Sequence, residues 1–202
     1  FAMAPSIASA ATNLIPNGDF SAGNSGFTPQ YNYVSPAPNI MWDEGNIPIA
    51  ANPMSVHNYW VNLPGSNPML IANGATAGNL TIWQESAINV VGGSKYNFGA
   101  QVMNVCCNDS FTGSNSPSSI IFQISTDGVT WTDLVSHTTT PPSDAGLPTT
   151  LSALYTAGAT GTISLRAIND INAPSGNDFA LDNLSFASAV PEPGTWAMLF
   201  LG

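Results

Sequence analysis

Charged residues are scarce in this sequence, and basic residues are nearly missing. Only 7% of the 202 residues are charged, and Lys95 and Arg166 are the whole basic complement. A surface that follows a nucleic-acid backbone needs clustered Lys and Arg, so the composition excludes nucleic acid as a partner. The net charge of -10 also disfavours binding to an anionic membrane surface.

Cysteine is almost as rare, because Cys106 and Cys107 are the only two and they are adjacent. They either close a vicinal disulfide ring, remain two half-buried free thiols, or form bridges to another chain. In an exported protein we favour the vicinal disulfide or the intermolecular link over a reactive thiol. His57 and His137 are distant in sequence from the two cysteines, which disfavours a metal site built on the cysteine pair.

Known catalytic motifs are missing as well. The sequence has no Gly-x-Ser-x-Gly elbow, phosphate-binding loop or His-Glu-x-x-His pair. Asp43, Glu44 and Glu85 could supply carboxylates for glycoside hydrolysis, but nothing in their spacing pairs them at a working distance. His57 and His137 fall in polar loops, where we expect them to be solvated. We predict that the protein is not an enzyme.

Neutral polar residues take the place of the missing charges. Ser, Thr and Asn make up 60 of the 202 residues, beside 18 Gly and 16 Pro. With few Lys, Glu and Arg to cover helix surfaces, this composition favours turns and half-buried strands. The 44% of hydrophobic residues can still bury a core, which argues against disorder.

Apolar and polar residues alternate in several short segments, which predicts β-strands. The segments are residues 79–89, 95–105, 119–125, 150–157, 161–168 and 179–186. Asp127-Gly128 before Trp131 predicts a hairpin, because Asp-Gly readily adopts the positive φ angles of a tight turn. We expect an all-β fold, an antiparallel β-sandwich over residues 13–187.

Residues 1–12 are expected to form an extended N-terminal arm. Phe1 to Ala10 are small and apolar and end in Ala8-Ser9-Ala10, which matches the cleavage pattern of a secretory signal. Because no initiator Met is present, the arm is either a signal-peptide remnant or the start of a mature chain. Both interpretations predict a secreted protein.

Residues 188–202 are expected to form a short C-terminal apolar tail. Here Val190 and the sequence Pro191-Glu192-Pro193 precede Gly-Thr-Trp and an apolar run. This segment resembles the PEP-CTERM sorting signal of Gram-negative bacteria. The resemblance implies recognition of Pro191, Glu192 and Pro193 by a membrane exosortase, and delivery to the cell surface or extracellular biofilm matrix. The apolar run is shorter than the roughly 20 residues that span a bilayer, so the sequence is either truncated or matured at Gly202.

Apolar segments at both ends of the chain predict self-association. Phe1 to Ile7 and Trp196 to Leu201 would be costly to leave in water. They pack against their own domain, against lipid or detergent, or against other copies of the chain. A tail donated to the next copy would close an open sheet edge and could build a filament.

The body of the chain resembles a second group of proteins. Residues 13–20 (Asn-Leu-Ile-Pro-Asn-Gly-Asp-Phe) and 177–186 are similar to the first and last strands of jelly-roll, galactose-binding-like domains, which are common in carbohydrate-binding modules. Ser125 to Thr132 resembles their Ser-x-Asp-Gly-x-x-Trp hairpin. The resemblance implies a jelly-roll sandwich, but it leaves the ligand open because folds host many functions.

This resemblance also implies a structural Ca²⁺ where the first and last strands meet. Its ligands would be Asp19, Asp178 and Asp182, with oxygens of Asn17 or Asn183. Three carboxylates with few cations nearby would repel one another unless they are spread apart or bound to metal. The alternative is that these Asp residues only cap turns.

Aromatic residues between Gln30 and Trp60 are candidates for glycan binding. Trp and Tyr rings can stack on sugar faces while Asn and Asp bind hydroxyl groups. Trp42, Tyr59 and Trp60 lie in such a polar, loop-rich stretch, together with Tyr31 and Tyr33. The alternative is that the rings cover the core of the sandwich.

Two functions follow from these observations. The main prediction is a non-catalytic, secreted structural or adhesive protein of the cell surface or matrix, which forms a homo-oligomer or polymer. The alternative is a monomeric glycan-binding module that anchors exopolysaccharide to the cell.

Overall fold

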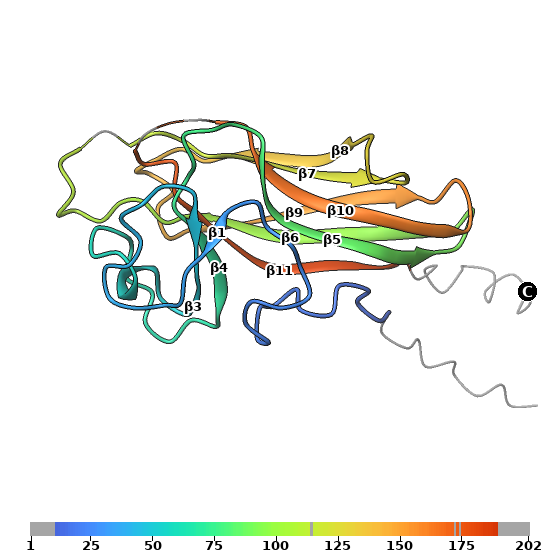
Figure 1. The fold of residues 1–202 in the computed structure, drawn as a ribbon, viewed down its shortest axis with the longest axis horizontal. Helices are drawn as coiled ribbons and strands as arrows, with labels where there is room; N and C mark the ends of the chain where they lie inside the picture. The colour runs from blue at the N-terminus through green and yellow to red at the C-terminus, as the bar shows by residue number, and fades with distance from the viewer. Residues whose placement is uncertain (1–10, 114, 172, 174, 190–202) are drawn as a thin grey trace, which may run out of the picture.

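The computed structural model describes residues 11–113, 115–171, 173 and 175–189, and two antiparallel sheets stacked face to face form most of it (Figure 1). In this part of the chain no helix is long and apolar enough to cross a membrane. The N-terminal arm up to Ala10 and the sorting motif Pro191-Glu192-Pro193 lie outside the described residues.

One sheet has four strands in the order β5–β10–β7–β8. They are β5 (Leu80–Val90), β10 (Gly161–Asn169), β7 (Ser119–Ser125) and β8 (Thr132–Thr138). The predicted hairpin joins β7 to β8, where Gly128 has φ 74 and the Asp127 carboxylate accepts the N–H groups of Val129 and Thr130 at 2.8 and 2.7 Å.

The other sheet has five strands in the order β3–β4–β11–β6–β9. They are β3 (Ile49–Ala50), β4 (Met69–Ala72), β11 (Phe179–Ser188), β6 (Lys95–Asn104) and β9 (Pro148–Thr156). A short parallel pair, β1 (Asn32–Tyr33) and β2 (Asn46–Ile47), and a 3-10 turn, η1 (Pro53–Ser55), lie in the long connections before β4.

The main core lies between the two sheets and explains the alternation in the sequence. On β6, Tyr96, Phe98, Ala100 and Val102 are buried in this core, and the residues between them face outward. The rings of Phe98 on β6 and Phe122 on β7 meet at a centroid distance of 5.0 Å. Burial of such rings is a large part of the stabilisation of a sandwich.

A second hydrophobic cluster covers part of the outer face of the five-stranded sheet. Met69, Ile71, Met103 and Ala180 project outward from β4, β6 and β11, and Trp60 packs on them from the preceding loops. These loops gather beside β3 and β4 at one end of the molecule, opposite the β7–β8 turn (Figure 1).

The predicted strand positions agree closely with the structure, with one exception. Six predicted segments correspond to β5, β6, β7, β9, β10 and β11, with ends that differ by at most two residues. Residues 13–20, expected to be the first strand, form no strand. They lie beside β11, and only Leu14 N–H to Phe186 O (2.7 Å) and Leu184 N–H to Gly18 O (2.8 Å) join the two backbones. Pro16 has no N–H to extend this pairing.

Candidate functional site

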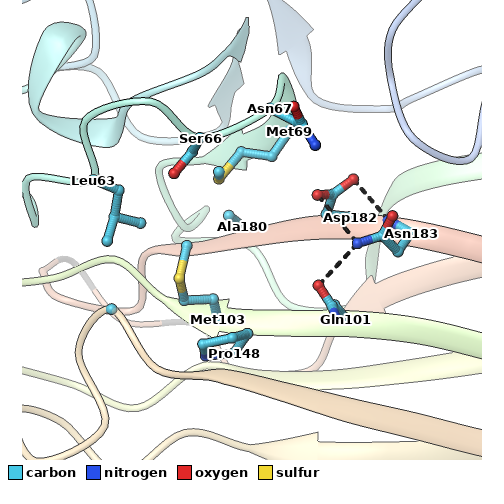
Figure 2. A pocket seen from close by; sticks show the side chains of 11 residues that line it. Leu63, Ser66, Asn67, Met69, Gln101, Met103, Pro148, Ala180, Asp182 and Asn183 are labelled. Atoms are coloured by element: carbon cyan, nitrogen blue, oxygen red, sulfur yellow. Dashed lines mark hydrogen bonds between the residues drawn. The ribbon is translucent and has the colours of Figure 1, made fainter.

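A hollow on the outer face of the five-stranded sheet is the first candidate site (Figure 2). It has a volume of about 320 Å³. We call it the sheet-face hollow and define it by its lining residues, which come from β4, β6, β9, β11 and two adjoining loops: Leu63, Ser66, Asn67, Met69, Gln101, Met103, Gly146, Pro148, Ala180, Asp182 and Asn183.

Strand register explains why these side chains meet. Asp182 on β11 is opposite Gln101 on β6, and Ala180 is opposite Met103. Since Val102 and Leu181 point into the core, their neighbours point outward. The pairing of β11 is irregular after Asp182, where Asn183 has φ 52, and Asn183 therefore adds its side chain to the same outer face.

One side of the sheet-face hollow is polar and the other is apolar (Figure 2). The Asn183 amide donates to Gln101 Oε1 at 3.0 Å, and the Asn183 backbone N–H donates to Asp182 Oδ1 at 2.7 Å. Burial raises the pKa of Asp182, and the nearby Asp19 charge adds to this rise. Met69 and Met103 supply the apolar side. Such a surface can accept hydroxyl hydrogen bonds and cover C–H groups.

A second hollow, the aromatic hollow, lies at the loop-rich end of the molecule. Its volume is about 180 Å³. Its lining combines four rings, two carboxylates and both cysteines: Trp42, Glu44, His57, Tyr59, Asn73, Cys106, Cys107, Phe111, Ser175, Gly176 and Asp178.

The rings of the aromatic hollow form one continuous wall. Trp42 lies 4.5 Å from His57 and 6.0 Å from Tyr59, and Tyr59 lies 5.6 Å from Phe111, measured between ring centroids. His57 in turn stacks on Trp60 at 4.8 Å. Trp42 is 55% exposed, so its ring is available to a ligand.

The charge in the aromatic hollow is negative. Burial raises the pKa of Asp178 to about 6, although hydrogen bonds from Gly74 N–H and the Trp60 indole stabilise its charged form. The Glu44 charge also raises the pKa of Asp178, and burial raises the pKa of Glu44 itself. Burial lowers the pKa of His57, which favours the neutral imidazole. No Lys or Arg lines the hollow.

Cys106 and Cys107 form a vicinal disulfide in the structure and are both buried. They belong to the second hydrophobic cluster and line the aromatic hollow. Cys106 also forms a β-bridge with Trp60, and the Asn108 amide donates to Asn58 O and Trp60 O at 2.9 and 3.0 Å. These contacts attach the aromatic wall to the end of β6.

The three predicted glycan-binding residues have different environments. Trp42 and Tyr59 meet in the wall of the aromatic hollow, as described above. Trp60 is only 1% exposed, so its ring faces are covered by protein. His57, which was expected to be solvated, is buried, and that expectation was wrong; the ring is enclosed by Trp42, Tyr59 and Trp60. The sequence did not predict that His57 and Phe111 line the aromatic hollow, because their placement depends on loop packing.

The three predicted calcium ligands are not gathered at one point. Among the described residues, no group of three or more His, Cys, Asp or Glu could hold a metal ion. Asp182 lies within electrostatic range of Asp19. The buried Asp178 carboxylate instead accepts Trp60 Nε1–H at 2.9 Å and Gly74 N–H at 3.1 Å. The arrangement therefore fits the predicted three-carboxylate site only in part, and calcium binding stays a prediction.

The carboxylates considered for hydrolysis are separated in the fold. Glu44 lines the aromatic hollow, whereas Glu85 lies on β5 of the other sheet and lines neither hollow.

Sequence reasoning missed the polar side of the sheet-face hollow. The outward positions of β6 could have indicated Gln101, but the irregular pairing that adds Asn183 has no sequence signal that we can identify.

No family model matches the chain, and no curated protein matches it in sequence. Among solved structures it is similar to the CBM22-1 xylan-binding domain of Paenibacillus barcinonensis Xyn10C, with a TM-score of 0.56 and 14% identity over 90% of this chain and 97% of that domain. The CBM22-1–CBM22-2 tandem domain of Xyn10C matches with a TM-score of 0.56 and 14% identity, over 95% of this chain and 49% of the tandem. Identity this low shows the fold alone. The structural similarity confirms the predicted jelly-roll sandwich and the predicted likeness of its fold to carbohydrate-binding modules.

Proposed function

We propose that the chain is a non-catalytic glycan-binding domain that holds a polysaccharide on the outer face of its five-stranded sheet. The observation that carries this proposal is the sheet-face hollow, where an amide and carboxylate row lies beside apolar methionines. Support also comes from the fold, which the chain shares with modules whose names describe xylan and carbohydrate binding.

The chemistry of the hollow suits a neutral glycan. A sugar unit presents hydroxyl groups around its rim and C–H groups on its faces. Gln101 and Asp182 provide acceptors for the hydroxyls, while Met69 and Met103 provide polarizable surface for the faces. Polar groups already placed by strand register lose little conformational freedom on binding, and this preorganisation favours affinity.

Affinity gel electrophoresis with xylan and a panel of neutral polysaccharides tests the proposal. We expect at least one polysaccharide to retard the protein. Gln101→Ala and Asn67→Ala should each weaken that binding about tenfold, the equivalent of one good hydrogen bond. Ser136→Ala on β8, in the other sheet, is the matched control. Retardation that is unchanged in both hollow variants, or absent with every polysaccharide, would contradict the proposal.

Export and a location in the extracellular matrix are part of the same proposal. They rest on the PEP-CTERM resemblance of residues 190–202. In a Gram-negative host with an exosortase, the parent chain should reach the cell surface or medium. A Glu192→Ala variant should instead stay inside the cells. Equal distribution of both chains would remove the support that the motif provides.

Self-association through the apolar ends also stays a prediction. Light scattering after size-exclusion chromatography should show a larger species for the full chain than for a chain without Phe1 to Ala10. Identical masses for the two chains would leave the monomeric glycan-binding module as the better description.

A further inference from the structure

The aromatic hollow shares no lining residue with the sheet-face hollow. We infer that it is a second ligand site, and that it binds an amino sugar whose amine is free and protonated. This inference rests on the proposed function, because the fold and the first site make a sugar the expected carrier of the ammonium group.

Ring geometry supports a cation as the ligand. A cation near the face of a Trp or Tyr ring is attracted by the negative π-face, and Trp is the strongest partner. Trp42 offers an exposed indole, and Tyr59 meets it nearly at right angles, with an interplanar angle of 83°. The two rings therefore present their faces to a ligand in two nearly perpendicular orientations. The same surfaces can cover the C–H groups of the sugar ring.

Charge in the hollow points the same way. Glu44 and Asp178 both line it, and neither forms an ion pair with Lys95 or Arg166, the chain's only basic side chains. Arg166 is instead occupied at Trp131, 4.1 Å from the ring centroid, and at Gln123. The buried Asp178 carboxylate has no counter-charge from a basic side chain, and burial of a charge in this way is costly. A ligand ammonium group would offset that cost, whereas a neutral sugar would not.

Size and stiffness suit a single sugar unit. The volume of about 180 Å³ is below the roughly 300 to 1,000 Å³ of pockets for drug-sized ligands. Asp178 is held by Trp60 and Gly74, and the Asn73 amide donates to Met41 O at 2.8 Å. The floor of the hollow is therefore built before a ligand arrives, which lowers the cost of binding.

Isothermal titration calorimetry with two matched oligosaccharides tests the inference. Glucosamine oligomers carry free amines, and N-acetylglucosamine oligomers of the same length carry neutral amides in the same place. We expect the glucosamine oligomer to bind at least tenfold more tightly. Glu44→Gln should reduce its affinity at least fivefold, and Trp42→Ala should do the same, with unchanged melting temperatures.

Two controls separate this site from general charge and from the first site. Asp170→Asn removes one exposed negative charge that lines neither hollow, so it should leave binding unchanged. Gln101→Ala should weaken neutral polysaccharide binding and leave glucosamine binding intact. A protein that binds a neutral polysaccharide but no glucosamine oligomer would overturn this inference and leave the proposed function intact.

Three other outcomes would also overturn it. The first is equal affinity for the acetylated oligomer, which would make the hollow a neutral sugar site. The second is an unchanged affinity in Glu44→Gln, which would remove the role of the charge. The third is equally tight binding of an oligolysine peptide, which carries amines without sugar faces.

Discussion

The indole nitrogen of Trp60 donates a 2.9 Å hydrogen bond to the buried carboxylate of Asp178, which lies 118 residues later in the chain. This contact joins the loop after η1 to the start of β11. It also makes Trp60 a structural residue that packs behind the aromatic wall, where it stacks on His57, whereas Trp42 on the same wall is 55% exposed.

Replacing Trp60 by Phe should destabilise the fold by about 1 to 3 kcal/mol, because one oxygen of the buried Asp178 would lose its donor. The midpoint of urea unfolding measures this loss. Trp131→Phe, in the β7–β8 turn, is the control, since the Trp131 ring is half-exposed and stacks on Arg166. Equal midpoints for Trp60→Phe and the parent chain would show that the hydrogen bond adds nothing to stability.

Stability should fall as the pH rises from about 4 to about 7. Burial raises the pKa of Asp178 from 3.8 to about 6 and that of Glu85 from 4.5 to about 7. The folded protein therefore holds these protons more firmly than the unfolded chain does. Their contribution is complete below the unfolded values and is lost as the pH passes the folded values.

Urea unfolding at pH 4, 5, 6 and 7 measures this pH dependence, and Glu85→Gln should flatten its upper half. Hydrogen bonds lower the pKa of Asp127, so its contribution declines mainly at more acidic pH. The lowered pKa of His57 acts against the trend, but it is one group, whereas burial raises the pKa of Asp182 and Glu44 as well as those of Asp178 and Glu85. A free energy of unfolding that rises steadily from pH 4 to pH 7 would be incompatible with these two shifts.

Removal of the Phe122 ring should cost about 3 to 5 kcal/mol, the usual range for a buried Phe replaced by Ala. Phe122 is fully enclosed between the sheets and packs on Phe98. Val129→Ala, at an 81% exposed position of the β7–β8 turn, should change stability by less than about 0.5 kcal/mol. Chemical denaturation of both variants checks the difference.

Gly18→Ala should weaken the contact between residues 13–20 and β11. A Cβ at Gly18 would collide with the backbone carbonyl group of Leu184, which cannot change rotamer as a side chain could. We expect a loss of about 1 to 3 kcal/mol, as for other overpacked sites. Gly158→Ala is the matched control, since a Cβ there meets no atom within 4 Å. Equal melting temperatures for the two variants would show that this contact is weak.

Calcium, if it binds, should act through Asp19 and Asp182, because Asp178 lies in the aromatic hollow, where it accepts hydrogen bonds from Trp60 and Gly74. A cation between Asp19 and Asp182 would relieve the repulsion of the two carboxylates. We expect added CaCl₂ to raise the melting temperature of the parent chain by a few degrees, and Asp182→Asn to abolish the rise. A melting temperature that responds neither to CaCl₂ nor to a chelator would reject the calcium prediction.

Local signals in the sequence were sufficient to predict β5, β6, β7, β9, β10 and β11, whereas β4 matches none of the predicted segments. Alternation on β6 places Tyr96, Phe98, Ala100 and Val102 on one face whatever the partner strand is, because side chains in a strand point to opposite faces in turn. The hairpin after Ser125 is equally local, since Asp127 satisfies the turn's own N–H groups. Residues 13–20 were the exception, because whether they formed a strand depended on contact with β11.

The sequence by itself determined an all-β chain with an acidic, cation-poor character and several candidate aromatic residues. Only the tertiary structure decided which of those residues are exposed and which are buried. Trp42 and Trp60 look alike in the sequence, yet one is 55% exposed and the other 1%. The difference arises because Asp178 holds Trp60 inside, and a contact across 118 residues leaves no mark in local composition.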